Sequence, residues 1–222
     1  MVTSGLLSSI PGVRHGFGSA ESLVPAELDP VWELRPAKRQ VHGIRVAAIS
    51  EPKHEVGDAD GFHTRVPGLP VSIITADCVP LLLARRDGSQ IAAVHAGWRG
   101  LHDGIIPAAL AAMGEGTTVV AAVGPTICAA CYEVSEELAE DFAQRFEALP
   151  REVVLPTHRH LDLRAIAEYQ LRASGVEEIE HVGGCTCCAR DAAGEPIYRS
   201  CRRGDRGSQM HSGLYITTKG EK

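Results

Sequence analysis

The sequence predicts an α+β fold in which helices flank a mixed β-sheet. Short apolar runs bounded by Gly, Pro or Asp crowd the first half of the chain, and segments with helical spacing do not follow each of these runs in turn. A doubly wound parallel sheet would require that alternation. The chain has 222 residues, of which 44% are hydrophobic and 23% charged, so we expect residues 1–222 to form one domain around a buried core.

Five apolar runs are predicted to be strands, because each is short and ends at residues that favour turns. They cover residues 44–49, 71–75, 81–84, 91–95 and 118–123.

Three segments are predicted to be helices, covering residues 103–113, 135–146 and 162–174. Ser135 and Asp162 are suitable N-cap residues, and Gly175 is placed to end the last helix. The segment 25–36 has little periodicity and is predicted to lie on the surface.

Charge and hydropathy exclude several classes of partner. The formal net charge of −6 does not fit a dominant nucleic-acid partner, which would require a basic surface. No run approaches the roughly 20 apolar residues of a membrane span, and the first residues lack the basic start of a secretion signal. We therefore expect a cytoplasmic protein whose seven cysteines are reduced thiols, metal ligands or core residues.

A predicted hairpin brings two metal-ligating side chains together. Asp87-Gly88 between two apolar runs is a strong hairpin signal, and pairing around it sets Cys78 opposite His95 or within a residue or two of it. Opposed residues have Cβ atoms about 5 Å apart, close enough for both side chains to bind one metal ion. Both residues stand at strand ends, where polar groups face a pocket.

Several motifs in order resemble the YfiH-like laccase-domain family. They are Gln40-Val-His-Gly43, Ala76-Asp-Cys78, His95-Ala-Gly-Trp-Arg-Gly100, Gly124-Pro125, Cys131-Tyr-Glu-Val134, Cys185-Thr186 and Tyr198-Arg-Ser-Cys-Arg-Arg203. Members were first called polyphenol oxidases or multicopper laccases. They are now regarded mainly as zinc-dependent purine nucleoside phosphorylases with adenosine deaminase and methylthioadenosine phosphorylase activity.

The resemblance implies a zinc site made of His42, Cys78 and His95, with zinc rather than copper as the cofactor. Two neutral imidazoles and one thiolate leave a fourth position for water or substrate, and zinc lowers the pKa of a bound water towards about 7. The implied substrates are a purine nucleoside with phosphate or water. The family's usual basic segment before the Gln-Val-His motif is missing here, so no phosphate-binding residue is predicted.

Four further residues are candidates for the site. Asp77 adjoins a ligand and is predicted to transfer protons or to orient a ligand or water, although capping a turn is an equal alternative. Gln40 either binds substrate or ends a strand. Trp98 either stacks on a base or packs against the protein, and Arg99 either attracts an anion or forms a surface ion pair.

The remaining cysteines are dense near residues 128 and 185. The cysteines of Cys128-Ala-Ala-Cys131 and Gly184-Cys-Thr-Cys-Cys188 are either ligands of a second, structural zinc or small buried residues.

Two other functions are also compatible with the sequence. One is a zinc amidase that edits cell-wall precursors; the other is a thiol-rich metal-binding or redox module centred on Cys185, Cys187 and Cys188. An ordinary multicopper oxidase is disfavoured, because it requires paired histidine motifs and the chain has 10 histidines with one His-x-His.

Overall fold

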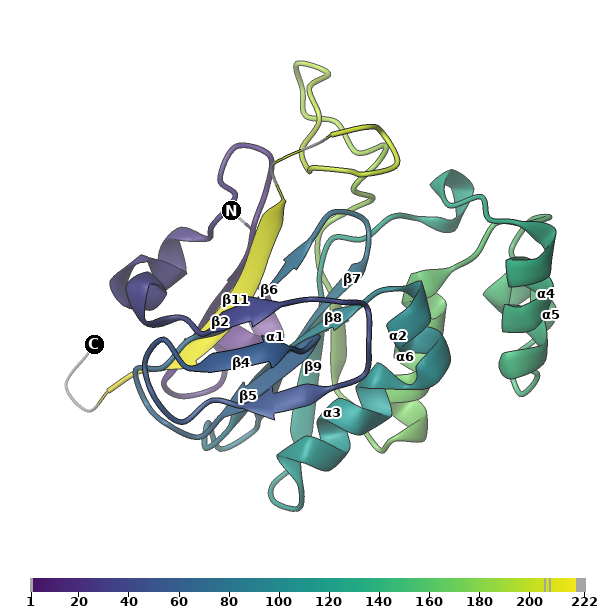
Figure 1. Cartoon of the computed structure of the whole chain (residues 1–222). Coiled ribbons are helices and arrows are strands. Elements are labelled where there is room, and N and C mark those ends of the chain that lie inside the picture. The colour runs from purple at the N-terminus through teal and green to yellow at the C-terminus, as the bar shows by residue number, and fades with distance from the viewer. Residues whose placement is uncertain (1, 206, 208, 219–222) are drawn as a thin grey trace.

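A six-stranded mixed sheet forms the centre of the computed structural model, which describes residues 2–205, 207 and 209–218 (Figure 1). Its strands are β3 (Val46–Ala48), β5 (Gly61–Thr64), β7 (Val79–Arg85), β8 (Ile91–Ala96), β9 (Val119–Val123) and β10 (Ile179–His181). The strand order is β10-β9-β7-β8-β5-β3. The two outermost pairs, β10 with β9 and β3 with β5, are parallel, and the other neighbours are antiparallel. The predicted mixed sheet of an α+β fold is confirmed.

Two smaller sheets accompany the central one. The first has the antiparallel order β1-β11-β6, and the second is a parallel pair of β2 with β4. Their strands are β1 (Val13–Phe17), β2 (Ala37–Arg39), β4 (Glu55–Asp58), β6 (Val71–Thr75) and β11 (Met210–Ile216). β11 therefore lies between two strands that precede it by more than a hundred residues.

The central strands are buried on both faces. Along β7, Leu81 and Leu83 point into a cluster shared with the helices, whereas Leu82 and Ala84 point into a cluster shared with Ile73 of the three-stranded sheet. Residues two apart on a strand share a face, so this alternation places the central sheet between a helical layer and a second sheet. Burial on both faces explains why β7 and β8 read as continuous apolar runs.

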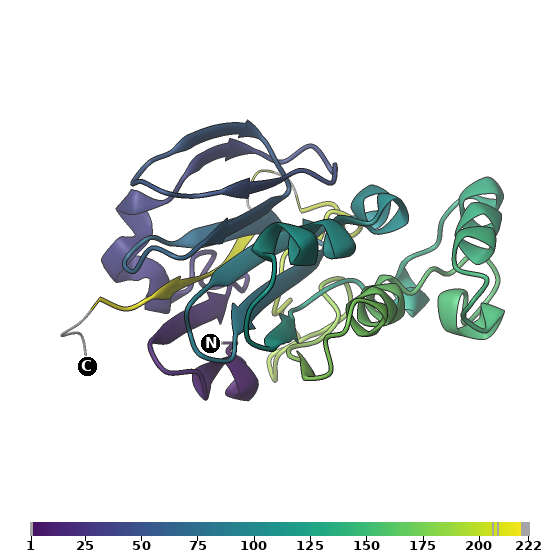
Figure 2. The ribbon, with the colours of Figure 1, turned by 90° about the horizontal axis from the view of Figure 1, so that it is seen from below.

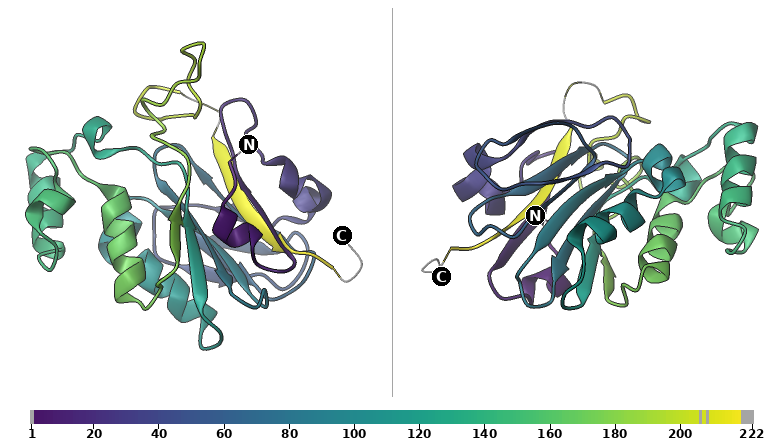
Figure 3. Two further views of the ribbon diagram at one scale, coloured as in Figure 1. Left: turned by 180° about the vertical axis from the view of Figure 1, so that it is seen from behind. Right: turned by 60° about the horizontal axis from the view of Figure 1, so that its bottom comes forward.

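Helices pack on both faces of the central sheet, those that carry Leu101, Ile105 and Ile166 on one face and the one that carries Leu7 on the other. They are α1 (Gly5–Ser8), α2 (Trp98–Asp103), α3 (Ile105–Met113), α4 (Glu136–Arg145), α5 (Arg151–Val154) and α6 (Leu163–Ala173), with 3-10 helices η1 (Ala26–Leu34) and η2 (Ala129–Cys131). Figure 2 shows α4 and α5 set apart from the sheets at one end of the molecule. In the view from behind, they lie on the flank opposite β11 (Figure 3, left).

The predicted helix caps are present. The side chain of Ser135 accepts a hydrogen bond from the Leu138 N–H at 3.3 Å, and that of Asp162 accepts one from the Ala165 N–H at 2.9 Å. Gly175 follows α6 with a φ of +86°, as a residue ending a helix does.

Two predictions about local structure are corrected. The expected helix over 103–113 is interrupted at Gly104, whose φ of +91° ends α2 and starts α3. The segment 25–36 is not wholly on the surface, because it contains η1, which buries Leu28 and Val31. Its apolar residues are spaced for the tighter 3-10 turn, and a search for the α-helical period misses them.

The predicted hairpin joins β7 to β8. Ala84 pairs with Ile91, and the Gly88 N–H donates to the Arg85 carbonyl across the turn. Gly88 has a φ of +73°, which suits glycine. Within the described part of the chain, no helix has the length and apolarity needed to cross a membrane.

Candidate metal centre and pocket

The structure brings His42, Cys78 and His95 together, with one donor atom from each lying within 4.8 Å of the others. His42 belongs to the loop after β2, Cys78 to the loop between β6 and β7, and His95 to β8. Pro80 pairs with His95, so Cys78 stands two residues from the position opposite His95, within the range that the hairpin predicts. The pairing of β7 with β8 brings Cys78 and His95 together, whereas His42 lies on a loop that is distant in the sequence.

A buried carboxylate, Asp60, fixes two of these side chains at once. Its Oδ1 accepts a hydrogen bond from His95 Nδ1 at 2.7 Å, and its two oxygens accept from the backbone N–H groups of Val41, His42 and Gly43 at 3.1, 2.9 and 2.8 Å. The residue has no exposed surface. Asp60 therefore fixes the position of the His95 ring relative to the loop that carries His42.

These hydrogen bonds also determine which nitrogen of His95 is free. Although burial raises it, the hydrogen bonds from His95 and the Gly43 and Val41 backbone keep the pKa of Asp60 below its ordinary value. A carboxylate that accepts from Nδ1 places the ring proton there and leaves Nε2 as a lone pair for a metal. A histidine oriented by a carboxylate in this way is the usual partner arrangement in zinc sites. The donor set of one thiol and two imidazoles, supported by Asp60, fits a zinc ion.

Backbone strain is concentrated beside the cluster. His42 and Asp77 have φ values of +62° and +96°, a region that residues with a side chain rarely adopt. The hydrogen bonds to Asp60 hold the first of these residues in place. Burial first, and repulsion from His95 second, lower the pKa of His42, so its ring is neutral and able to act as a ligand near pH 7.

Cys78 is a neutral thiol in the absence of a cation. Burial, followed by the negative charge of Asp77, raises the pKa of Cys78 to about 12. A thiol with that pKa is a poor nucleophile, and a bound metal is the means by which proteins convert such a thiol to a thiolate. The raised pKa thus favours a ligand role for Cys78 over a nucleophilic one, and a catalytic role for Cys78 stays a prediction.

The carboxylate of Asp77 points away from the ligand set. Its Oδ1 accepts from the Thr186 hydroxyl at 2.6 Å, and its Oδ2 accepts from the Arg202 N–H at 2.7 Å. The Asp77 carbonyl accepts from the Thr126 hydroxyl and the Ile127 N–H. Asp60, which the sequence did not single out, is the carboxylate that orients the candidate ligand His95. Proton transfer by Asp77 stays a prediction.

The cluster lines a pocket of about 240 Å³. The pocket is bounded by the three candidate ligands, the end of β6 and residues of the long segment between β10 and β11, with Lys38, Gln40, Cys201 and Gln209 among its lining side chains. The part of this segment before residue 206 forms the loops that extend beyond the sheets at the top of Figure 1. The ends of all three sheets therefore contribute to one cavity.

Lys38 is the cation of this pocket that the sequence missed. Its Nζ donates to the Ser72 hydroxyl at 3.0 Å and lies 4.7 Å from the centre of the Phe62 ring. Burial, followed by repulsion from Arg35, lowers the pKa of Lys38 to about 7. No motif marks this residue, because a lysine on a short, half-exposed strand usually serves solubility.

The three predicted substrate-binding residues, Gln40, Trp98 and Arg99, are less favourably placed for contact with a substrate. The Gln40 amide donates to the Ile74 carbonyl at 2.8 Å and accepts from the Ile74 N–H at 2.7 Å, so it pairs with the edge of β6. Trp98 packs partly against the core, with the exposed Arg99 guanidinium 4.9 Å from its ring. Neither Trp98 nor Arg99 lines the pocket. Their roles in binding substrate stay predictions.

The C-terminal motifs support the loop that carries Asp77 and Cys78. Thr186 and the Arg202 backbone hold the Asp77 carboxylate. Arg203 in turn donates to the carbonyls of Thr186 and Cys187, both at 2.9 Å, and pairs with Asp205. These motifs stabilise the strained turn before Cys78.

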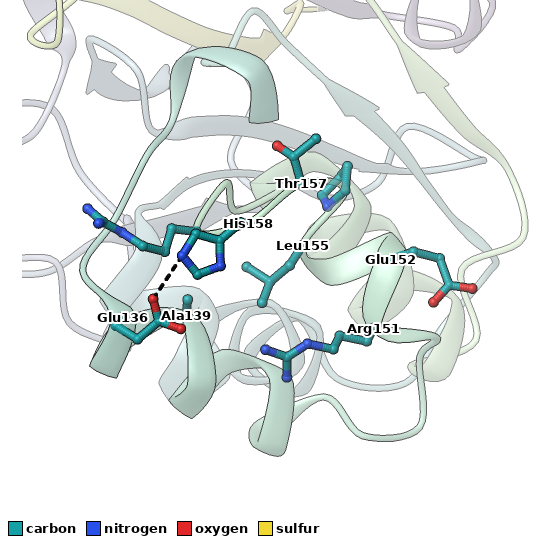
Figure 4. Close-up of a pocket in the computed structure, with 9 residues that line it drawn as sticks. Glu136, Ala139, Arg151, Glu152, Leu155, Thr157 and His158 are labelled. Atoms are coloured by element: carbon teal, nitrogen blue, oxygen red, sulfur yellow. Dashed lines mark ion pairs between the residues drawn. The ribbon is translucent and has the colours of Figure 1, made fainter.

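A larger hollow, of about 340 Å³, lies between α4 and the region after α5 (Figure 4). Several of its charged side chains form ion pairs. His158 pairs with Glu136 at 3.1 Å, as the dashed line marks, and Arg151 pairs with Glu140. The hollow is open and holds neither of the two groups of metal-ligating side chains found among the described residues. The candidate metal ligands His42, Cys78 and His95 line the smaller pocket instead.

Solved structures share this fold. A Neisseria meningitidis protein aligns with a TM-score of 0.77 at 23% identity, covering 98% of this chain and 99% of that one. YlmD from Geobacillus stearothermophilus aligns with a TM-score of 0.70 at 26% identity, covering 84% of this chain and 74% of that one.

Sequence relatives extend the likeness. A protein of Streptomyces coelicolor named purine nucleoside phosphorylase is 38% identical over 215 residues, covering 89% of this chain and 87% of its own. The Shigella flexneri protein named purine nucleoside phosphorylase YfiH is 32% identical over 189 residues, and the match covers 84% of this chain and 74% of that protein. The family model described as multi-copper polyphenol oxidoreductase laccase matches residues 30–211. With a match that spans every motif of the candidate centre, the chain belongs to the YfiH-like laccase-domain family.

Proposed function

We propose that this chain is a zinc-dependent purine nucleoside phosphorylase whose zinc ligands are His42, Cys78 and His95. The observation that carries the proposal is the convergence of these three donors, with Asp60 behind His95, on a pocket that is also lined by a half-buried lysine. The names of the relatives supply the reaction class. In that reaction the bond from the purine to the anomeric carbon breaks and a bond from that carbon to a phosphate oxygen forms.

The donor set fits zinc better than a multicopper centre. Among the residues that the structure describes, only one candidate metal group contains histidine, and it supplies two imidazoles. Multicopper oxidation requires several ions bound by many histidines. A zinc ion held by three protein ligands supplies Lewis-acid polarisation of a substrate oxygen.

The protein's own residues divide the remaining work. Asp60 keeps the His95 proton on Nδ1 and the His42 loop closed around the centre. Lys38, in its ammonium form, attracts the phosphate dianion into the pocket. Thr186 and the Arg202 backbone keep the Asp77 turn, and with it the Cys78 side chain, in place.

The proposal is tested by incubating the purified protein with inosine, with and without phosphate. Hypoxanthine release that requires phosphate, and that falls at least about 100-fold in Cys78→Ala and after chelation, is expected. Restoration by added Zn²⁺ should occur in the parent and not in the variant. Full activity of metal-free protein would contradict the proposal, and release without phosphate would indicate hydrolysis.

Parallel arms of the same assay separate the other activities of the family. Adenosine is tested for release of adenine or formation of inosine, and methylthioadenosine for release of adenine. Oxygen consumption with a phenol tests oxidation, and serine release from a serine-containing cell-wall precursor tests the amidase reaction. Phosphate-dependent adenine release alone would keep phosphorolysis and change the preferred nucleoside, whereas inosine formation, oxygen consumption or serine release alone would replace phosphorolysis as the function.

Lys38→Met is expected to raise the KM for phosphate about tenfold at pH 6 while leaving the KM for inosine within about twofold. The pKa of Lys38 is lowered to about 7, so the ammonium form dominates below that pH and is lost above it. The ratio of the phosphate KM values of variant and parent should therefore approach one by about pH 9. Lys53→Met, at an exposed lysine, is the control. A ratio that does not vary with pH would remove Lys38 from phosphate binding.

A further inference from the structure

A second group of potential ligands lies apart from the candidate metal centre. Cys128, Cys131, Cys185 and Cys188 place their sulfur atoms within 4.8 Å of one another, and all four are free thiols. Cys128 Sγ and Cys188 Sγ are 4.0 Å apart. Four sulfurs on a tetrahedral zinc, each about 2.3 Å from the ion, are about 3.8 Å apart. The spacing in this structure is close to that geometry.

Each half of the group is a pair of cysteines separated by two residues and folded into a tight turn. The Cys131 N–H donates to the Cys128 carbonyl at 3.0 Å, and the Ala189 N–H donates to the Cys185 carbonyl at 3.1 Å. Such turns direct both sulfurs of a pair to one side. Two pairs with this spacing are the usual ligand pattern of a structural zinc site.

Backbone pairing holds the two turns face to face. Thr126 forms a parallel bridge with Cys185, and the Thr186 N–H donates to the Thr126 carbonyl at 3.1 Å. The Cys128 N–H donates to Cys185 Sγ at 3.2 Å. An N–H group directed at sulfur stabilises a thiolate and is arranged before any ion binds.

Positive charge is available to offset that of the thiolates. Four thiols that bind one Zn²⁺ release four protons and form a centre with a charge of −2. The Arg190 and Arg203 guanidinium groups both donate to the Cys187 carbonyl, at 3.0 and 2.9 Å, inside the second turn. These cations lie beside the loop that would carry the negative charge.

We propose that Cys128, Cys131, Cys185 and Cys188 bind one structural zinc ion. Because all four positions are filled by protein ligands, the ion has no open position for a substrate, and its role is to join two segments. The joined segments carry Thr126 and Thr186, whose hydroxyls donate to the carbonyl and the carboxylate of Asp77. The ion thereby fixes the turn before Cys78 without contacting the pocket. This site does not depend on the proposed function.

The structure also sorts the cysteines that the sequence grouped together. Cys187 lies between two members of the cluster in the chain and, like Cys131 and Cys185, packs against the hydrophobic core. It is absent from the ligand group. Cys187 therefore provides a matched control two residues from Cys185.

The test measures zinc per chain in the full-length protein, purified without chelators. The double variant Cys128→Ser, Cys188→Ser is expected to lose about one zinc equivalent relative to the parent, and Cys187→Ala to lose none. His42→Ala should lose the zinc of the candidate centre and keep the zinc of the four cysteines. The zinc content of the cysteine variants can therefore be compared with that of the parent even if the protein has no nucleoside activity. After exchange with Co²⁺, the ion that survives in His42→Ala should have the absorption of an all-sulfur tetrahedral site.

A second measurement, on His42→Ala, which lacks the ion of the candidate centre, covers the case in which the double variant does not fold. A mercurial reagent that titrates thiols should release zinc in proportion to the cysteines modified, while native mass spectrometry reports the ions bound. Iron with visible absorption in place of zinc, paired disulfides in the isolated protein, or unchanged zinc content in the folded double variant would each overturn the proposal.

Discussion

Asp60→Asn is expected to weaken metal binding at the cluster of His42, Cys78 and His95 by about 10- to 100-fold, with a parallel loss of nucleoside turnover. The parent carboxylate is fully buried and accepts hydrogen bonds from one ring nitrogen and three backbone N–H groups. An amide has one acceptor oxygen and two N–H donors, so it leaves at least one of these donors opposite another donor. The unmade bonds cost about 1–3 kcal/mol of stability as well.

Asp58→Asn is the matched control for that experiment. Asp58 lies two residues earlier, is half exposed, and pairs with the Arg39 side chain at 2.6 Å on the surface. Surface pairs contribute little, so its metal affinity and turnover should stay within about twofold of the parent. Competition with a chromophoric chelator measures affinity in all three proteins. Equal affinities for Asp60→Asn and the parent would show that Asp60 does not orient a ligand.

The hairpin could be predicted from the sequence because its determinants are local. Asp87 and Gly88 fix the turn, and apolar runs on either side fix the register, so the distance from Cys78 to His95 follows from counting. His42 could not be obtained in that way. It lies on a loop held by Asp60, and only the resemblance to a known family connected it with the other two.

Asp60 was missed for a related reason. In Asp60-Gly61 the pattern indicates a turn, and nothing local shows that the carboxylate is buried against a histidine 35 residues away. Strand β11 was missed as well, because the short, polar-interrupted run 210–216 gains its place from pairing with β1 and β6. Non-local pairing of this kind leaves little trace in a single sequence.

The four-cysteine group could be predicted from the sequence only in part. The two-residue spacing of each pair is visible in the sequence, but the presence of Cys187 made the second pair ambiguous. The bridge from Thr126 to Cys185 resolves it by setting which thiols face one another. Pairs of ligands are thus predictable from local spacing, whereas the meeting of two pairs requires the fold.

Gly97→Ala is expected to fold and to lose at least about 100-fold in kcat/KM together with metal at the centre. A Cβ atom at this position would lie 2.8 Å from His42 Cδ2 and 3.1 Å from Cys78 Sγ, closer than such atoms pack. The backbone itself accepts alanine, because φ at Gly97 is −73°. The added methyl group therefore acts on the ligands rather than on the strand or on α2.

The least costly relief for that contact is movement of the exposed His42 ring outward, which opens the centre while the core stays packed. Gly5→Ala is the control, since its Cβ would meet only Glu180 Oε1 at an ordinary 3.7 Å. The melting temperature of the metal-free Gly97→Ala protein should lie close to that of the metal-free parent. Retention of both zinc and phosphorolysis by the folded variant would show that His42 and Cys78 do not share an ion, because one methyl group between them would then leave their joint function intact.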